Sequence, residues 1–303
     1  MSYKNELFAL CGELGCQCRE NEPLRAHTTF KIGGNAEAVV FINSAESLSE
    51  ILGFLKSNNV RYFVIGKGSN ILADDKGFDG VILKIGKDFS EIKLIGENEI
   101  YCTAGASLSE VCKFALDNSL TGLEFAYGIP GTAGGGLYMN AGAYGGELKD
   151  VVKSAHYIDA DSEIKEIQAQ DMELAYRTSI FAKTQDKIIT DMTFSLKKGG
   201  KDDIKAKMDE LMNKRRTKQP LEYPSAGSTF KRPEGSYASL LIEECGLKGL
   251  TVGGAQVSEK HSGFVINVGG ATFDDVMKLT QKVQDIVFEK TGFKLELEPI
   301  ILR

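Results

Sequence analysis

Residues 125–136 read FAYGIPGTAGGG, which places five glycines and one proline in twelve positions, and three more glycines follow by residue 146. Structural turns rarely need so many glycines together. Backbone that passes within van der Waals distance of a large flat ligand does need them, because any Cβ would collide with the ligand. The alternative is a glycine-rich loop that crosses a helix closely. The stretch therefore predicts a close approach of the backbone, either to a ligand or to another element.

A second glycine-containing stretch, GKGSN at 66–70, ends the apolar run RYFVIG. Its glycines let the backbone turn sharply and aim successive N–H groups at one anion, and Ser69 and Asn70 add side-chain donors. That geometry suits a pyrophosphate, although a plain tight turn explains the residues equally well. The sequence matches neither the Rossmann G-x-G-x-x-G nor the P-loop pattern, and no helical pattern follows. Together, the two stretches predict a dinucleotide bound by a fold other than the Rossmann fold.

The overall composition limits the partners and the compartment. The chain has 303 residues, of which 42% are hydrophobic, enough for two or three domains. A net charge of −6 provides no global attraction to nucleic acid or to an anionic membrane, so we expect neither as a partner. Glu6 and Glu13 interrupt the N-terminal segment, and no run of 18 apolar residues occurs. We expect a cytoplasmic protein, and a monomer.

The cysteines and histidines predict no metal site. Cys11, Cys16 and Cys18 have the spacing C-x4-C-x-C, which is not a standard zinc pattern, and the three histidines are far apart in sequence. The other three cysteines fall in patterns typical of strand or helix interiors, namely Cys102, Cys112 and Cys245. We expect six reduced thiols, and the N-terminal three have no assigned role.

The hydrophobic pattern predicts strands and helices mixed without the regular alternation of a doubly wound sheet, so the fold class is α+β. Predicted strands cover 36–43, 61–66, 80–85, 91–95, 99–105, 151–159, 187–196, 261–269 and 294–302. Predicted helices cover 45–59, 107–118, 204–217, 237–245 and 273–292. The first two helices contain SLSE, with capping-box spacing from Ser47 to Glu50 and from Ser107 to Glu110. The polar stretch KKGGKDD at 197–203 predicts a domain boundary.

Several polar side chains outside the glycine stretches are candidates for chemistry. Ser228 lies in SAGSTFKRP, which is not G-x-S-x-G and has no histidine nearby, so its hydroxyl is better suited to deliver a proton than to attack as a nucleophile. Arg177 in YRTSIF can pair bidentately with a carboxylate, although a structural salt bridge is the default. Glu298 could be a surface charge, and the four cations of NKRRTK at 213–218 are typical of a solvated helix end.

Six motifs follow one another from residue 28 to residue 299. They are TTFKIGGNAE (28–37), GKGSNIL (66–72), GIPGTAGGGLYMNAGAYGGEL (128–148), YRTSIF (176–181), PSAGSTFKRP (224–233) and LELEP (295–299). In this order they resemble the UDP-N-acetylenolpyruvoylglucosamine reductase family of flavoenzymes, in its compact second type. The resemblance implies an FAD-binding domain of the vanillyl-alcohol-oxidase (PCMH) type at 1–200, made of two α+β subdomains split near 75–80. A smaller α+β substrate domain at 201–303 follows.

The resemblance also implies non-covalent FAD as cofactor and NADPH as co-substrate. The implied pyrophosphate contacts are Gly66, Lys67, Gly68, Ser69 and Asn70. The implied contacts along the flavin are Gly128, Ile129, Pro130, Gly131, Thr132, Gly134, Gly135, Asn140, Gly142 and Ala143. On this interpretation the bare backbone makes room for the flavin. His27 and Cys102 keep covalent attachment open in principle, although neither lies in an attachment motif.

The reaction that the resemblance implies reduces the enolpyruvyl ether of UDP-N-acetylglucosamine to UDP-N-acetylmuramate, a precursor of peptidoglycan. Arg177 and Glu298 match positions that stabilise the enolate, for which Glu298 must be protonated or act through a donor. Ser228 matches the proton donor to the α carbon. The implied substrate-binding residues are Tyr176, Lys218 and Lys231. Pro299 stands where the family commonly has a β-branched residue, and it restricts Glu298 to extended conformations.

Two other functions stay open at this point. The same flavin fold could serve an oxidase or dehydrogenase of another small alcohol or sugar. The combination of Ser228, Arg177 and Glu298 argues against that function, because an alcohol oxidase needs no proton donor to an enolate. Alternatively, the glycine stretches could form an anion-binding module without redox chemistry, and a colourless purified protein would favour that function.

Overall fold

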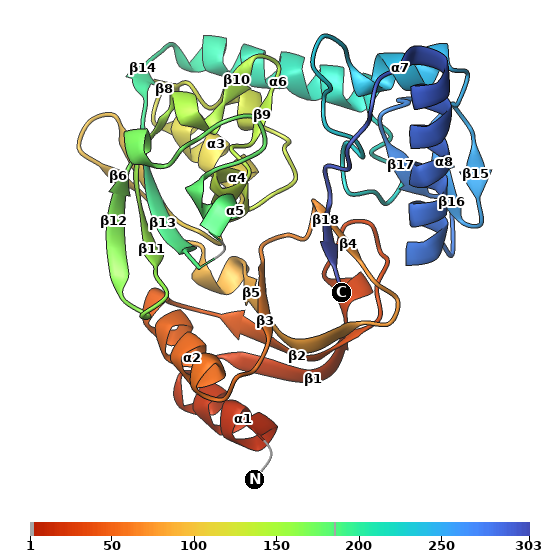
Figure 1. Cartoon of the computed structure of the whole chain (residues 1–303). Coiled ribbons are helices and arrows are strands. Elements are labelled where there is room, and N and C mark those ends of the chain that lie inside the picture. The colour runs from red at the N-terminus through yellow and green to blue at the C-terminus, as the bar shows by residue number, and fades with distance from the viewer. Residues whose placement is uncertain (1–2, 185) are drawn as a thin grey trace. The chain divides into compact units, whose positions relative to one another are not determined.

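The computed structural model describes residues 3–184 and 186–303, and the chain divides into two compact units. Unit 1 consists of Met1–Glu20, Ala38–Lys67 and Gly80–Asn213. Unit 2 consists of Asn21–Glu37, Gly68–Asp79 and Lys214–Arg303. The chain, drawn from red to blue in Figure 1, therefore passes between the units repeatedly, and one passage falls inside the turn GKGSN. None of the helices in the described ranges is both long enough and apolar enough to span a bilayer.

The N-terminal part of unit 1 combines two helices with a four-stranded sheet. Helices α1 (Tyr3–Glu13) and α2 (Ala45–Ser57) contact each other (Figure 1). The apolar residues of α2 recur at helical spacing and are fully buried: Leu48, Ile51, Leu52 and Leu55. The sheet has the order β1-β2-β5-β3, with β3 and β5 parallel. Its strands are β1 (Gln17–Pro23), β2 (Asn35–Ile42), β3 (Tyr62–Ile65) and β5 (Phe78–Ile85).

An antiparallel five-stranded sheet forms the rest of unit 1, with the order β12-β11-β13-β7-β6. Its strands are β6 (Ile92–Ile95), β7 (Glu99–Thr103), β11 (Val152–Ile158), β12 (Ile164–Gln168) and β13 (Ile188–Ser195). Helices α3 (Leu108–Asp117), α4 (Ala133–Tyr138) and α5 (Ile180–Thr184) gather on one face of it (Figure 1). Two short strand pairs complete the unit: β8 (Leu120–Thr121) with β14 (Lys197–Lys198), and β9 (Gly142–Ala143) with β10 (Gly146–Glu147).

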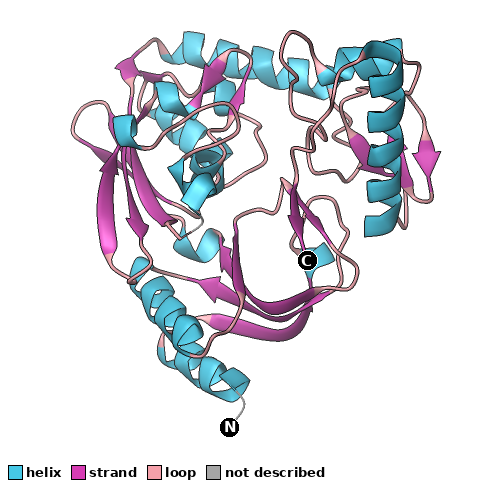
Figure 2. Cartoon of the chain, in the orientation of Figure 1, coloured by secondary structure: helices cyan, strands magenta, loops and turns pink. Residues whose placement is uncertain are grey.

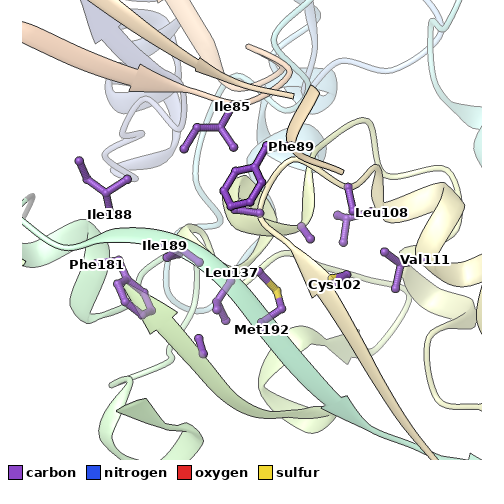
Figure 3. Close-up of a cluster of buried hydrophobic side chains, with 14 of the residues drawn as sticks. Ile85, Phe89, Cys102, Leu108, Val111, Leu137, Phe181, Ile188, Ile189 and Met192 are labelled. Carbon is purple, nitrogen blue, oxygen red and sulfur yellow. The ribbon is translucent and has the colours of Figure 1, made fainter. Parts of the chain in front are cut away.

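Apolar side chains from this sheet and its helices meet in one buried cluster, part of which Figure 3 shows. Cys102 comes from β7 and Met192 from β13, while Leu137 comes from α4 and Phe181 from α5. All four side chains are fully buried. The short glycine-rich helix α4 is therefore fixed to the sheet mainly by Leu137, its one fully buried large side chain, while Tyr138 packs against the same cluster and is partly buried.

Unit 2 packs helix α8 (Phe273–Thr291) against the antiparallel sheet β15-β16-β17. The strands are β15 (Thr251–Val252), β16 (Ala255–Val257) and β17 (Val265–Asn267). Helix α6 (Lys201–Lys218) leads into this unit, and α7 (Ala238–Glu244) contacts α8. Strands β4 (Ile71–Ala73) and β18 (Ile300–Leu302) pair in parallel. Figure 2 shows that much of this unit, including the segment between α6 and α7, is loop.

Most predicted elements form, but the predicted capping boxes are wrong. Helix α2 begins at Ala45, as predicted, so Ser44 is its N-cap and Ser47 is the reciprocal partner. Ser107 does precede α3, but its side chain makes no cap bond, and Leu108 N donates to Gly131 O instead. Helices α1, α4 and α5 and strands β1, β4 and β12 were not predicted, nor were the short strands β8–β10 and β14–β16.

The two C-terminal strands are shorter than predicted. The predicted strand 294–302 pairs only over Ile300–Leu302, with one isolated bridge at Leu297. The predicted strand 261–269 pairs only over Val265–Asn267, because residues 261–264 form a turn closed by Phe264 N and His261 O. In both segments the apolar pattern extends further along the chain than the pairing with a neighbouring strand. The pattern therefore predicted strands that are too long.

Replacement of Leu137 by alanine tests the anchoring of α4. Leu137→Ala leaves a cavity in the cluster of Figure 3, so we expect a loss of about 2–5 kcal/mol in the free energy of unfolding, measured by denaturant titration. Leu94→Ala on β6 is the control, because that side chain is 38% exposed and its loss costs about 1 kcal/mol or less. Equal losses in the two variants would contradict the anchoring role.

Candidate active site

The two glycine stretches are in contact within unit 1. A Cβ atom on Gly66, which follows β3 directly, would collide with Oγ1 of Thr132. Thr132 is buried and is the N-cap of α4, where its Oγ1 accepts a hydrogen bond from Gly135 N at 3.3 Å. Position 66 therefore requires glycine because the GKGSN turn and the start of α4 approach each other. The structure thus brings together two stretches that are more than 60 residues apart in sequence.

Lys84 supports the first half of the GKGSN turn, although the sequence did not single it out. Its Nζ donates to Gly66 O at 2.6 Å, from the strand β5 that pairs with β3. No local motif marks Lys84, because it reads as one polar position in an apolar strand. The bond engages the carbonyl oxygen of Gly66 and places a positive charge beside the predicted pyrophosphate turn.

The second half of the turn is held within unit 2. Gly68 has a φ of +68°, and a Cβ there would collide with His27 O, so both its conformation and its surroundings require glycine. Gly68 O accepts a hydrogen bond from Thr29 N at 3.1 Å, and Asn70 O accepts one from Ile300 N at 2.9 Å. With the bond to Gly66 O, three carbonyl groups of the turn are occupied by the protein itself. This is the orientation expected of a turn whose N–H groups serve a ligand.

The glycines of α4 divide into two groups. Gly134 and Gly136 are buried, and a Cβ on Gly134 would lie 2.7 Å from that of Ala104. Gly135 is exposed, and a Cβ there would meet only Thr132 Oγ1, at 3.4 Å. The inner glycines therefore let the helix pack closely on the protein, whereas Gly135 leaves bare backbone at the surface. The predicted close approach to another element is therefore present at Gly134 and Gly136, whereas the approach to a ligand stays a prediction that the exposed Gly135 suits.

Packing within the protein also accounts for two of the later glycines. A Cβ on Gly142 would lie 2.7 Å from the Glu147 side chain, and one on Gly146 would lie 2.6 Å from the ring of Phe125. Packing is therefore a second reason for glycine in this stretch, and the role of the bare backbone toward the flavin stays a prediction. Gly134, Gly136, Gly142 and Gly146 are required by contacts inside unit 1, whatever ligand the stretch binds.

The N–H groups at the start of α4 are occupied. Ala133 N donates to Ala106 O at 2.7 Å and Gly134 N donates to Ala104 O at 2.9 Å, while Gly135 N uses the Thr132 side chain. The first turn of this helix therefore offers no open set of donors to an anion. The pyrophosphate prediction consequently rests on the GKGSN turn and not on the helix.

Arg177 lies at the tip of a tight turn beside the glycine-rich stretch. Ala175 and Thr178 exchange backbone hydrogen bonds of 3.1 and 3.2 Å, and Arg177 between them has a φ of +54°. Its Nη2 donates to Gly142 O at 3.3 Å, and its guanidinium lies 5.2 Å from the ring centre of Tyr176. Unit 1 therefore brings Arg177 and Tyr176 together with the predicted flavin contacts. Tyr176 is 46% exposed, as a ligand-facing ring can be.

Ser228 and Glu298 are held close together in unit 2 by Thr229. Thr229 N donates to Gly263 O at 2.8 Å, and its Oγ1 accepts a bond from Val265 N at 2.8 Å. On its other side, Thr229 O accepts a hydrogen bond from Glu298 N at 3.0 Å. Thr229 is buried, whereas Ser228 and Glu298 are only half-buried. The segment with the predicted proton donor thus runs antiparallel to the segment with the predicted carboxyl group.

Pro299 lies where the C-terminal segment changes partners. Glu298 N bonds to Thr229 O, whereas Ile300 N bonds to Asn70 O, and Asn70 Nδ2 donates to Glu298 O at 3.3 Å. A proline between the two partnerships leaves no donor unpaired, because it has no N–H. The predicted pyrophosphate residue Asn70 is therefore tied directly to the segment that carries Glu298.

The predicted lysine contacts lie at the surface of unit 2. Lys218 is exposed at the end of α6. Lys231 Nζ lies 3.3 Å from Glu296 Oε2 in a surface ion pair. Such pairs stabilise a fold by little, so both lysines are available to an anionic ligand at little cost. Among the described residues, no cluster of three or more histidine, cysteine or acidic side chains is arranged to hold a metal ion.

The arrangement fits a flat dinucleotide cofactor, and the comparisons with known proteins identify it. Residues 36–168 match the family model of an FAD binding domain, and residues 219–302 match that of the UDP-N-acetylenolpyruvoylglucosamine reductase C-terminal domain. Gly66 at the contact with Thr132 and the bare backbone at Gly135 fit the approach of a flavin. The fold is α+β, with an FAD-binding domain of the PCMH type and a separate C-terminal domain. The protein is therefore an FAD-dependent oxidoreductase.

Curated relatives cover nearly the whole chain. The UDP-N-acetylenolpyruvoylglucosamine reductases of Caldanaerobacter subterraneus subsp. tengcongensis and Alkaliphilus oremlandii are 47% and 48% identical. The matches span 91% and 92% of this chain, and 90% and 91% of the relatives. The crystal structure of the same reductase from Thermus caldophilus matches with a TM-score of 0.81 and 31% identity, over 95% of this chain and 99% of that one. The chain belongs to the UDP-N-acetylenolpyruvoylglucosamine reductase family.

Substitution at Gly66 tests whether the contact between the two stretches matters for FAD. Gly66→Ala forces its Cβ against Thr132, so we expect about tenfold weaker FAD binding, measured by flavin fluorescence on reconstitution of the apoprotein. Gly53→Ala on α2 is the matched control, because no atom outside its own helix backbone and its chain neighbours lies within 4 Å of a Cβ placed there. If FAD affinity is unchanged in Gly66→Ala, the contact between Gly66 and Thr132 is not needed for FAD binding.

Proposed function

We propose that the enzyme uses NADPH to reduce the enolpyruvyl ether of UDP-N-acetylglucosamine to UDP-N-acetylmuramate. The observation that carries the proposal is the hydrogen bond between Thr229 O and Glu298 N, which holds Ser228 close to Glu298. Adjacent backbone segments that carry a proton donor and a carboxyl group suit a reduction that creates and then protonates an enolate. The names of the curated relatives support the same substrate. The product would be a precursor for cell wall biogenesis, on which cell shape and division depend. The enzyme would make it in the cytoplasm.

FAD is the cofactor, and we assign its contacts to both glycine stretches. Bound FAD supplies hydride transfer between NADPH and the substrate. The pyrophosphate residues are Gly66, Lys67, Gly68, Ser69 and Asn70. The flavin residues are Gly128, Ile129, Pro130, Gly131, Thr132, Gly134, Gly135, Gly142 and Ala143, together with the backbone of Asn140, whose side-chain amide is used inside the protein. Lys84 adds a positive charge beside the first of these sets, through its bond to Gly66 O.

The side chains outside the glycine stretches act on the substrate. The guanidinium of Arg177 pairs with the substrate carboxylate and stabilises the negative charge that forms on it. Glu298 assists as a protonated acid or through a bridging donor, since a bare carboxylate beside an enolate would be repelled. Ser228 Oγ then donates its proton to the α carbon. The substrate-binding residues are Tyr176, Lys218 and Lys231, the two lysines facing its anionic groups.

We propose a division of the chain into a cofactor domain and a substrate domain. Residues 1–200 form the FAD-binding domain, with subdomains split near 75–80, and residues 201–303 form the substrate domain. The matched ranges 36–168 and 219–302 fall inside these limits. We expect small-molecule partners alone, with the protein active as a monomer.

The test follows the flavin absorbance of Ser228→Ala under anaerobic conditions. NADPH should bleach the variant as it bleaches the unchanged enzyme, because Ser228 takes no part in flavin reduction. Reoxidation by the enolpyruvyl ether should slow by about 100-fold or more, because the proton donor is lost. Ser236→Ala, in the same domain, should leave both rates unchanged.

Two outcomes would overturn the proposal. If the flavin of the unchanged enzyme bleaches with NADPH but is not reoxidised by the enolpyruvyl ether, the substrate is wrong. If Ser228→Ala is reoxidised at the normal rate, the assigned proton donor is wrong.

A further inference from the structure

Asn140 is fully buried, and its side chain makes three hydrogen bonds within unit 1. Its Nδ2 donates to Glu147 Oε2 at 2.9 Å and to Ala175 O at 3.0 Å, while its Oδ1 accepts a bond from Lys149 N at 2.9 Å. Both amide hydrogens are therefore used inside the protein. Any contact with FAD would have to come from the backbone of Asn140 or from its remaining acceptor site.

The bond to Ala175 holds the turn that carries Arg177. Ala175 is the first residue of that turn, and it lies 35 residues from Asn140 in sequence. A second tie comes from Ser179 Oγ, which donates to Tyr138 O at 2.7 Å on the other side of the turn. Because Arg177 has a left-handed φ of +54°, its conformation persists only if neighbouring groups hold it.

The Glu147 carboxylate that Asn140 bonds lies near Arg177, because Glu147 pairs with Gly142 across β9 and β10 and Gly142 O accepts the hydrogen bond from Arg177 Nη2. The pKa of Glu147 lies below its usual value, because Lys149 donates a hydrogen bond to it and because Asn140 and the Arg177 charge add to that effect. Lys149 Nζ lies 2.9 Å from Glu147 Oε2. Asn140 thus holds both the backbone turn under Arg177 and a carboxylate that attracts its guanidinium.

We propose that Asn140 is the positioning residue of Arg177. It acts through the Ala175 carbonyl and the Glu147 carboxylate, and it does so independently of any contact with the cofactor. The catalytic consequence rests on the proposed function, in which Arg177 stabilises the enolate. Loss of Asn140 should therefore impair the reaction with the substrate and spare the reaction with NADPH.

Two substitutions remove the bonds in different ways. Asn140→Gly removes the side chain and tolerates the φ of +42° at this position. Asn140→Asp keeps the shape but replaces the donating amide by a carboxyl group facing Glu147 and Ala175 O. The matched control is Asn98→Gly, in the turn between β6 and β7. It removes a single hydrogen bond of 2.8 Å, from the Asn98 side-chain amide to Leu196 O. All three proteins are compared as FAD-loaded enzymes.

The first measurement is hydrogen exchange, which needs no substrate. The backbone amides of Ala175 and Thr178 are bonded across the turn, so a peptide covering 173–180 reports on its opening. We expect exchange about tenfold faster in both Asn140 variants and unchanged in Asn98→Gly. Unchanged exchange in the Asn140 variants would overturn the positioning role, whatever the enzyme reduces.

The second measurement separates the two half-reactions and includes Arg177→Ala. Reoxidation by the enolpyruvyl ether should slow by about tenfold in the Asn140 variants, with flavin content and NADPH reduction within about twofold of normal. Adding Asn140→Gly to Arg177→Ala should slow reoxidation by no more than about twofold further, because both changes remove the same contribution, that of the positioned Arg177 side chain.

The outcomes separate this inference from the proposed function. Equal loss in both half-reactions, or loss of FAD, would mean that Asn140 supports the cofactor stretch and not Arg177. Full additivity with Arg177→Ala would overturn the inference as well. If the unchanged enzyme is not reoxidised by the enolpyruvyl ether, the proposed function fails, and the exchange experiment still decides whether Asn140 holds the turn.

Discussion

The contact between Gly66 and Thr132 is the constraint on which the candidate site depends. It lets the end of an apolar strand reach the start of a helix with no side chain between them. Thr132 occupies this position because its hydroxyl caps the N-terminus of α4. Helix α4 can approach so closely because Gly134 packs directly on Ala104. A methyl group at either glycine would separate two stretches that both contribute to FAD binding in our proposal. The glycines are thus required first by the protein's own packing, and in our proposal the cofactor contacts the backbone that this packing leaves bare.

Short hydrogen-bonded links position the side chains that we propose to be reactive, in both units, and no long strand or helix carries these side chains. Arg177 depends on a four-residue turn that Asn140 and Ser179 tie down. Ser228 and Glu298 depend on Thr229, whose backbone and hydroxyl groups bond to three residues on two different segments. Such links are directional and buried, so losing one partner leaves an unsatisfied polar group and is costly. They can hold a loop as firmly as regular secondary structure would.

The sequence could predict a large part of this fold, and several of the errors share one origin. Helices α2 and α8 are evident from apolar residues at helical spacing, and four strands of the five-stranded sheet, all except β12, from apolar runs. The capping box at Ser107 and the strand 294–302 were wrong because both depend on a partner outside the local window. Leu108 N bonds to Gly131 O, and the C-terminal segment changes partners around Pro299. Lys84 escaped assignment for the same reason, and Asn140 was predicted to contact the flavin but not to hold the Arg177 turn.

The sequence by itself determined the family, the cofactor and the candidate reactive residues, because these depend on residue types at fixed spacing along the chain. Only the tertiary structure decided which glycines serve the protein's own packing and which leave backbone exposed. It also decided that the amide of Asn140 belongs to the Arg177 turn, and that Thr229 joins Ser228 to Glu298. The physical reason is that a close approach or a hydrogen bond depends on the distance between atoms in space, and residues that meet here are 35 to 70 positions apart in the chain.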